Sequence, residues 1–305
     1  RHPGYPLMRQ LPNGKWAMRV HQQAIYLNGN GSSSEGDRPF LDRLDLVKFE
    51  REHLFKCSED SYEAVVALMA EDGSQFVTRH ETAEEHPNYF LRKLNDPERK
   101  PLTQFKDPAK SLREVQKKLI TYEREDGVML NCMLHLPPGY DLDNPSPLPT
   151  ILWAYPRAYT QGKVAGQVAN SPHRFSSFAG ASPRFLALQG YAVLDQVAMP
   201  IVGEADTVND NFTVQIVDNA EAAIEAVVKM GVCDPSRVGV GGHSYGAFMA
   251  VMLLANSDLF QAGVARSGAY NRTLTPFGFQ NERRTLWDAP KTYMEMSPLL
   301  AVPKI

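Results

Sequence analysis

Short apolar runs separated by polar turns fill the first 95 residues and predict β-strands. The clearest turn is Asp72-Gly73, a dipeptide that favours β-hairpins, between the apolar runs 67–69 and 76–78. Regular antiparallel strands of this kind are typical of propeller blades or of a sandwich. No blade repeat in this short stretch decides between the two. The predicted strands span residues 24–27, 40–47, 52–57, 65–69, 75–80 and 88–91.

A polar segment over residues 101–115, with several prolines and charges, follows these strands and is the predicted linker between two domains. Beyond the linker, the turn 125–127, Glu-Asp-Gly, joins a second pair of predicted strands at 118–123 and 128–135. The β-rich pattern therefore continues into the start of the second domain.

From residue 149 onward the pattern changes, and continuous apolar strands alternate with helix-forming sequence. The longest predicted helix, 212–230, is stopped by Gly231. Its apolar side is expected to comprise Val214, Ile216, Val217, Ala220, Ala223, Ile224 and Val227. The other predicted elements are strands at 149–155, 191–197, 238–240 and 262–265 and helices at 184–189 and 247–256. Such alternation predicts a mostly parallel sheet with helices on both faces.

Composition places the chain among globular proteins, because 305 residues with 43% hydrophobic side chains can build a substantial core. The net charge of −3, with both signs interspersed, gives no basic field for nucleic acid and no acidic tail. Three widely spaced cysteines, Cys57, Cys132 and Cys233, argue against a disulfide framework or a clustered zinc site and favour a reducing compartment. No run of about 18 apolar residues predicts a membrane span.

The strongest chemical signal is the pentapeptide 242–246, Gly-His-Ser-Tyr-Gly, which has the pattern G-x-S-x-G. In this motif a sharp turn between a strand and a helix exposes the serine hydroxyl at the edge of an α/β sheet. The apolar run 238–240 precedes the pentapeptide and the apolar helix 247–256 follows it, which is the order that the motif requires. Ser244 is therefore the predicted nucleophile.

Attack by a serine creates an oxyanion that needs hydrogen-bond donors fixed in advance. The backbone N–H of Tyr245 is expected where that oxyanion forms. A second donor must come from a loop after an earlier strand, and the hydroxyl of Tyr155 is placed to supply it. On the residues alone, a Tyr155 that simply packs at the sheet edge is an equal alternative.

The general base is missing from its expected place. In this fold the acid and the histidine follow the serine along the chain, but all eight histidines lie at or before His243. His243 is adjacent to the serine and is expected to be a packing residue, while His135 or His173 would have to approach from another loop. Losing the base of such a triad costs on the order of 10⁶ in turnover. The residues alone thus leave open an esterase of the same fold and a non-enzymatic, hydrolase-like interaction protein.

Longer strings around the pentapeptide narrow these alternatives. They lie at 241–249, 265–280 and 284–290, and upstream at 29–41, 153–157, 165–168 and 199–204. In these strings the sequence resembles the prolyl oligopeptidase family of serine peptidases, and within it the glutamyl endopeptidase branch of plant chloroplasts and bacteria. The resemblance extends over nearly the whole chain.

The resemblance implies an α/β-hydrolase fold preceded by antiparallel blades of a partial β-propeller. Residues 1–100 would be the last part of the propeller, 101–115 the linker, and 116–305 the hydrolase domain without its last strands. It also implies that the chain is a fragment whose acid and histidine lie beyond Ile305, so the chain alone is expected to be inactive.

The function implied by the resemblance is that of a serine endopeptidase that cleaves after glutamate through an acyl-enzyme on Ser244, with Tyr155 and Tyr245 at the oxyanion hole. Peptides or unfolded proteins would be its substrates, and no nucleic acid, membrane, metal or cofactor is implied. A soluble, intracellular location is expected, in the chloroplast stroma if the source is a plant or an alga. A cation would read the glutamate carboxylate. The candidates are Arg157, Arg266 and Arg272, each of which is equally a candidate for a structural ion pair.

Overall fold

The computed structural model describes residues 4–12, 14–33, 35–166, 168 and 170–305, which form two compact units. Unit 1 comprises Arg1–Arg113 and Val168–Ser177, and unit 2 comprises Glu114–Gln167 and Phe178–Ile305. The short second segment of unit 1 lies between the two segments of unit 2 in the sequence. No sequence pattern indicated that this segment belongs to unit 1. Ser34 and Gln167, which belong to two of the strings quoted above, lie outside the described residues.

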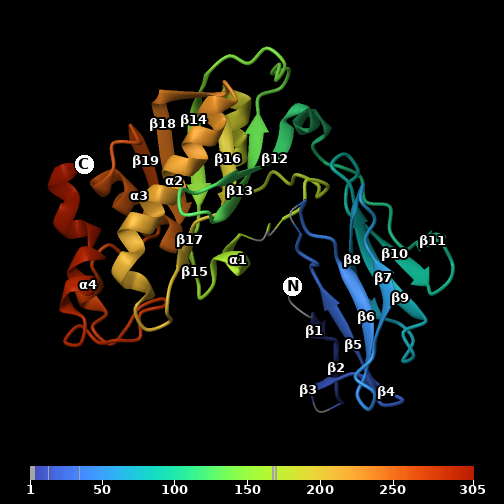
Figure 1. The fold of residues 1–305 in the computed structure, drawn as a ribbon. Helices are drawn as coiled ribbons and strands as arrows, with labels where there is room; N and C mark the ends of the chain where they lie inside the picture. Colours follow the sequence, from blue (N-terminus) through green and yellow to red (C-terminus); the bar gives the residue numbers. More distant parts are fainter. Residues whose placement is uncertain (1–3, 13, 34, 167, 169) are drawn as a thin grey trace. The chain divides into compact units, whose positions relative to one another are not determined.

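Unit 1 is built from antiparallel strands, drawn in blue to cyan in Figure 1. These strands are β1 (Tyr5–Pro6), β2 (Met8–Gln10), β3 (Trp16–Met18), β4 (Val20–His21), β5 (Ala24–Gly29), β6 (Phe40–Asp45), β7 (Arg51–Lys56), β8 (Tyr62–Leu68), β9 (Gln75–Glu81), β10 (Asn88–Lys93) and β11 (Arg99–Pro101). One sheet has the order β1-β5-β6-β7 with β4 beside β5, a second has the order β11-β10-β9-β8, and β2 pairs with β3. The 3₁₀ segment η1 (Lys110–Glu114) follows.

The predicted hairpin at Asp72-Gly73 is confirmed, because it joins the antiparallel strands β8 and β9. Gly73 has a φ of +75°, and a Cβ at this position would lie 2.5 Å from the ring of Tyr26. The turn therefore requires glycine for its backbone and for close packing. Tyr26 belongs to the apolar cluster of this unit, together with Leu41, Val65, Leu68 and Phe76.

Unit 2 contains a six-stranded sheet. Its elements are β12 (Gln116–Glu123), β13 (Met129–Leu136), β14 (Leu148–Ala154), β15 (Arg157–Tyr159), α1 (Gly162–Ala165), η2 (Pro183–Gln189), β16 (Ala192–Val197), β17 (Pro200–Val202), η3 (Val208–Asn211), α2 (Phe212–Lys229), β18 (Cys233–His243), α3 (Tyr245–Asn256), β19 (Ala262–Arg266), η4 (Arg272–Leu274), α4 (Pro290–Glu295) and η5 (Pro298–Lys304). The strand order is β12-β13-β16-β14-β18-β19, with β15 paired to β17 separately. The pairs from β16 to β19 are parallel, as predicted, whereas β12 and β13 join the sheet in antiparallel fashion.

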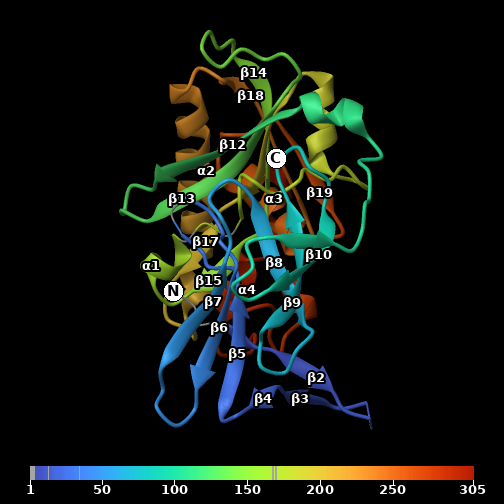
Figure 2. The ribbon, with the colours of Figure 1, turned by 90° about the vertical axis from the view of Figure 1, so that its right-hand side faces the viewer.

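The two faces of this sheet are covered by different elements (Figure 2). Neighbouring residues of a strand point to opposite faces. Leu152 accordingly lies in the large core formed with α2 and α3, whereas Ile151 packs with Ala187 of η2 in a separate small cluster. The segment predicted as a helix at 184–189 is the 3₁₀ segment η2, so the second face is covered by a short turn structure.

The apolar side predicted for α2 needs one correction. Ile216, Ala220, Ala223, Ile224 and Val227 are buried, but Val214 is 61% exposed. Residues two positions apart on a helix are rotated by about 200° relative to each other, so Val214 points away from the core when Ile216 faces it. The buried side of α2 also includes a polar residue, Asn219, which is fully buried and whose amide group bonds the Pro200 carbonyl and the Arg124 guanidinium.

Within the described residues, no helix has both the length and the apolar character that crossing a membrane demands. The three cysteines are buried and free.

Candidate active site

Ser244 is the single residue between β18 and α3, and its backbone is strained. Its φ of 57° and ψ of −115° lie in a region that non-glycine residues rarely adopt. The Ser244 N–H donates to the Arg266 carbonyl at 2.9 Å, and the Ser244 carbonyl accepts from the N–H groups of Ala247 and Phe248 at 3.1 and 3.2 Å. These bonds to β19 and α3 hold the half-buried serine at the tip of the turn.

The two glycines of the pentapeptide allow backbones to approach closely on both sides of this turn. A Cβ on Gly242 would lie 2.3 Å from the carbonyl carbon of Gly246, and a Cβ on Gly246 would lie 2.3 Å from the carbonyl oxygen of Ala154. Neither position has room for a side chain. The start of α3 is therefore packed directly against the ends of β18 and β14.

The structure brings Tyr155 and Tyr245 together beside the serine turn. Tyr155 directly follows β14, and its ring lies edge-on to the ring of Tyr245 with 6.1 Å between centroids. Tyr245 is the first residue of α3, where a backbone N–H has no acceptor within the helix and the helix dipole favours negative charge. Tyr155 is 45% exposed, so a ligand can reach this residue.

The side chain of Tyr245 is buried among aromatic rings, with Phe212 at 5.6 Å and Phe248 stacked at 5.2 Å between centroids. Among the described residues its hydroxyl finds no hydrogen-bond partner. Burial raises the pKa of Tyr245 well above its ordinary value, although the charge of Arg272 opposes the shift. The hydroxyl thus stays protonated and can donate.

The three candidate arginines lie in different surroundings. Arg272 begins η4 and is 5% exposed, with its guanidinium carbon 4.2, 4.7 and 5.6 Å from the ring centres of Phe248, Phe279 and Tyr245. Burial lowers the pKa of Arg272, and Tyr245 acts in the opposite direction. Arg157 and Arg266 are exposed at the ends of β15 and β19. Phe248 and Phe279 lie in the strings 241–249 and 265–280, but the sequence assigned neither of them a role at the site.

No hydrogen bond in the described part of the chain joins the Ser244 hydroxyl to a histidine. His243, the expected packing residue, is exposed, and its Nδ1 lies 3.2 Å from the Arg266 carbonyl oxygen, so it is not a buried packing residue. His135 is buried in β13, with Nε2 4.0 Å from a carboxylate oxygen of Asp195. Burial, followed by the charges of Arg184 and Lys117, lowers the pKa of His135 to about 3. His173 belongs to unit 1, and His2 lies outside the described residues.

A charged network that the sequence did not reveal fixes the loop after Phe279. Arg284 binds the carboxylate of Asp210 with two nitrogens, at 2.7 and 3.1 Å, and that of Glu282 at 2.9 Å. The Thr292 hydroxyl donates to Asp210 at 2.6 Å. The network joins η3, the 279–284 loop and α4, and the sequence separation of Asp210 and Arg284 explains why no local pattern predicted it.

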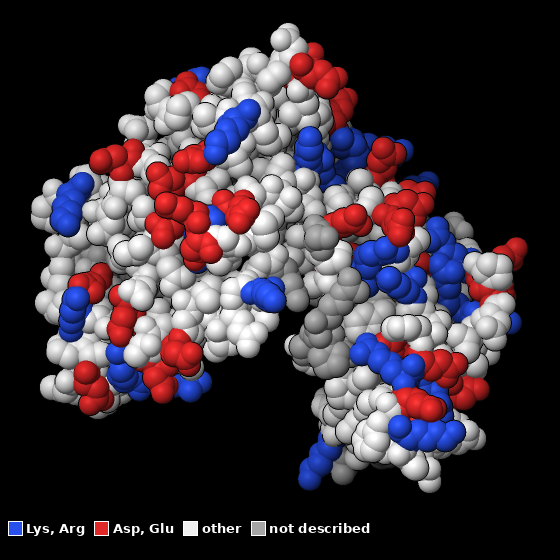
Figure 3. Space-filling model, viewed as in Figure 1, with Lys and Arg blue, Asp and Glu red and all other residues white. Residues whose placement is uncertain are grey.

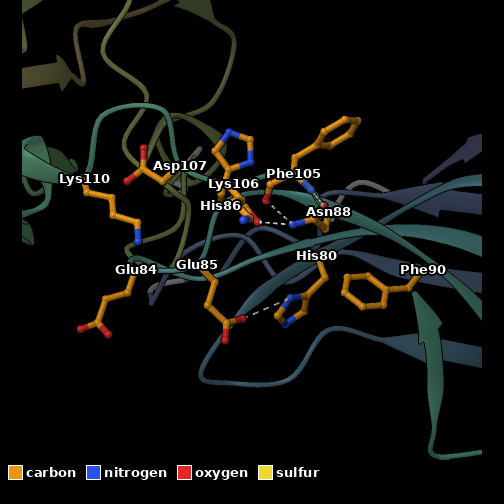
Figure 4. A pocket seen from close by; sticks show the side chains of 10 residues that line it. All are labelled: His80, Glu84, Glu85, His86, Asn88, Phe90, Phe105, Lys106, Asp107 and Lys110. Atoms are coloured by element: carbon orange, nitrogen blue, oxygen red, sulfur yellow. Dashed lines mark hydrogen bonds and ion pairs between the residues drawn. The ribbon is translucent and has the colours of Figure 1, made fainter. Parts of the chain in front are cut away.

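Two other concave surfaces carry charges. In unit 1 a cavity of about 340 Å³ lies between the 84–86 loop and residues 105–110 (Figure 4), and the His80 ring is 4.0 Å from the Glu85 carboxylate within it. In unit 2 acidic side chains gather over α2 (Figure 3). They line a groove of about 580 Å³ that includes Glu123, Glu125, Asp218, Glu221 and Glu225. Across the described residues no three His, Cys, Asp or Glu side chains are grouped so as to hold a metal ion.

Comparison with known proteins gives consistent matches. Residues 205–304 match the Prolyl oligopeptidase family. "Probable glutamyl endopeptidase, chloroplastic" from Oryza sativa subsp. japonica is 43% identical over 319 residues, and the protein of the same name from Arabidopsis thaliana is 41% identical over 320 residues. Each alignment covers 99% of this chain, which spans 34% and 33% of the length of these curated relatives.

Solved structures show the same fold at low identity. Porphyromonas gingivalis dipeptidyl peptidase 4 matches 94% of this chain and 39% of its own with a TM-score of 0.65 and 18% identity, a likeness that concerns the fold alone. The predicted fold class, an α/β-hydrolase sheet preceded by antiparallel propeller-like blades, is confirmed, and so is the predicted family resemblance.

Proposed function

We propose, on the premise that residues 205–304 are a prolyl oligopeptidase family domain, that the protein is a serine endopeptidase with Ser244 as its nucleophile. The observation that carries this proposal is the strained backbone of Ser244, with its φ of 57° and ψ of −115° between β18 and α3. Strain of this kind is retained where function needs it. A serine that only capped a helix would gain nothing from this conformation, since its side chain makes no capping hydrogen bond.

The proposed reaction proceeds through an acyl-enzyme. A general base takes the proton of the Ser244 hydroxyl while Oγ bonds to the carbonyl carbon of the scissile peptide. The resulting oxyanion accepts hydrogen bonds from the Tyr245 backbone N–H and the Tyr155 hydroxyl. The amine leaves with the proton, and a water molecule then releases the acyl group from Ser244. The base and its acidic partner are assigned to no residue of this chain.

We infer cleavage on the carboxyl side of glutamate, in peptides or unfolded proteins. Support comes from the names of the two curated relatives, both called glutamyl endopeptidases, and from cationic side chains on this part of the fold. Arg157, Arg266 and Arg272 are the candidates for binding the glutamate carboxylate. Both relatives are also named chloroplastic, so for a plant or algal source we propose a location in the chloroplast.

Cleavage mapping tests this function. The product of the complete reading frame is incubated with a reduced, unfolded protein, and the new carboxyl termini are identified by mass spectrometry. The proposal predicts termini at glutamate, and none with the Ser244→Ala variant. Cleavage without preference for glutamate would refute the specificity, and unchanged cleavage by Ser244→Ala would refute the nucleophile. Turnover of p-nitrophenyl esters without cleavage of any peptide would favour an esterase instead.

A further inference from the structure

Two hydrogen-bond donors by the first turn of α3 are buried and find no partner among the described residues. These donors are the hydroxyl of Tyr245 and Nε of Arg272. Tyr245 is 4% exposed and Arg272 is 5% exposed. The guanidinium carbon of Arg272 lies 5.6 Å from the centre of the Tyr245 ring. A buried donor without an acceptor costs free energy, and the cost is larger for a charged group. Two such donors on neighbouring side chains therefore indicate an acceptor that is supplied by a ligand.

A second buried arginine in the same unit shows what a structural role looks like. Arg124 is 4% exposed, binds both carboxylate oxygens of Asp126 at 2.8 and 2.7 Å, and donates to Asn219. Arg272 is equally buried but has no ion-pair partner in the described part of the chain. The nearby acid Glu282 is bound by Arg284 and Asn209. The side chain of Arg272 is instead flanked by Phe248 and Phe279, whose ring faces attract a cation but accept no conventional hydrogen bond.

We propose that Arg272 and the Tyr245 hydroxyl form an anion subsite that binds the side-chain carboxylate of the residue whose peptide bond Ser244 attacks. This inference rests on the proposed function and adds to it the residues that read the substrate. A carboxylate is an acceptor only, so it matches two donors without leaving a donor of its own unpaired. The position of Tyr245 directly after the serine, at the start of α3, places the subsite beside the reacting bond.

The subsite has a measurable consequence for selectivity. Glutamine has nearly the same shape as glutamate but carries no charge, so it would leave the buried guanidinium uncompensated. Sites built around a hydrogen bond to the substrate reject an analogue that lacks the bonding group by about 10⁴- to 10⁵-fold. We expect the Ser244→Ala variant to bind a peptide with a central glutamate at least about 100-fold more tightly than the glutamine peptide. Removing the neutral donor of Tyr245 should reduce this ratio by about fivefold to tenfold.

The experiment measures binding by fluorescence anisotropy, with two dye-labelled peptides that differ only by glutamate or glutamine. The protein is the product of the complete reading frame carrying Ser244→Ala, so no turnover disturbs the equilibrium. Arg272→Met should bring the ratio of the two dissociation constants close to 1, Arg272→Lys should restore part of it, and Tyr245→Phe should lower it. Arg124→Met is the matched control, because it removes an equally buried arginine and should leave the ratio unchanged.

The assignment would be refuted if the ratio of the two dissociation constants were unchanged in Arg272→Met, or if it fell to about 1 in Arg157→Met or Arg266→Met instead. Equal binding of both peptides to the parent protein would also refute it. If Arg272→Met does not fold, Tyr245→Phe and Arg272→Lys provide the test. An unchanged ratio of dissociation constants in both of these variants would refute the subsite. The two proposals fail separately. A glutamate preference that depends on Arg272 in a protein whose Ser244 proves unreactive leaves the anion subsite standing and removes the peptidase.

Discussion

Gly246→Ala is the sharpest test of how the serine turn is built. The added Cβ would lie 2.3 Å from the Ala154 carbonyl oxygen, and ordinary contacts begin near 3.4 Å. The start of α3 and the end of β14 must therefore separate by about 1 Å, and both partners are backbone, which cannot rotate away. Overpacking of this kind costs about 1–3 kcal/mol, and we expect the upper end of that range.

The matched control is Gly239→Ala in the preceding strand β18, where the added Cβ would find its nearest neighbour at 3.5 Å. Guanidinium denaturation is followed by tryptophan fluorescence, since Trp153 lies at the end of β14 beside the clash. Gly246→Ala should lower the transition midpoint clearly, whereas Gly239→Ala should change the free energy of unfolding by less than about 1 kcal/mol. Equal midpoints for the two variants would refute the close backbone contact.

Two further predictions concern titratable side chains. Hydrogen bonds from Arg284 hold the pKa of Asp210 below its usual range and, against the effect of burial, do the same for Glu282. This network therefore stabilises the fold above about pH 4, and the stabilisation is lost as the pH falls through the lowered pKa values. Arg284→Gln should lower the free energy of unfolding by about 1–3 kcal/mol at pH 7, and in denaturation measured over a pH series it should weaken the loss of stability at acidic pH. Burial lowers the pKa of His135 to about 3, so as the pH drops the unfolded chain takes up a proton before the folded chain does. The free energy of unfolding should therefore fall as the pH drops from about 6.5 towards 3. His135→Leu should remove this pH dependence, and an unchanged pH dependence would contradict the buried, neutral imidazole.

Local patterns predicted the elements of the fold well. The Asp72-Gly73 hairpin, the parallel strands of the second unit and the strand, turn and helix around Ser244 all follow from short-range chemistry: turn residues, apolar periodicity and glycines where backbones meet. The exposure of Val214 departs from the prediction because apolar character alone does not fix which face of a helix is buried. The buried face of this helix also includes the hydrogen-bonded Asn219.

The surroundings of the site depend on contacts that are distant in sequence. Arg272 was one of three equivalent cations in the sequence, and only packing against Phe248 and Phe279 distinguishes it from Arg157 and Arg266. Likewise, the segment Val168–Ser177 joins unit 1 through tertiary contacts that leave no periodicity. Sequence therefore predicted the candidate residues, and their different surroundings become visible only in the structure.

The most direct test of the central claim is covalent labelling of the serine. The product of the complete reading frame is treated with a fluorophosphonate probe, and the modified peptide is identified by mass spectrometry beside the Ser244→Ala variant. We predict one labelled serine, Ser244, and no labelling of the variant. Equal labelling of the two proteins would show that Ser244 is not the nucleophile.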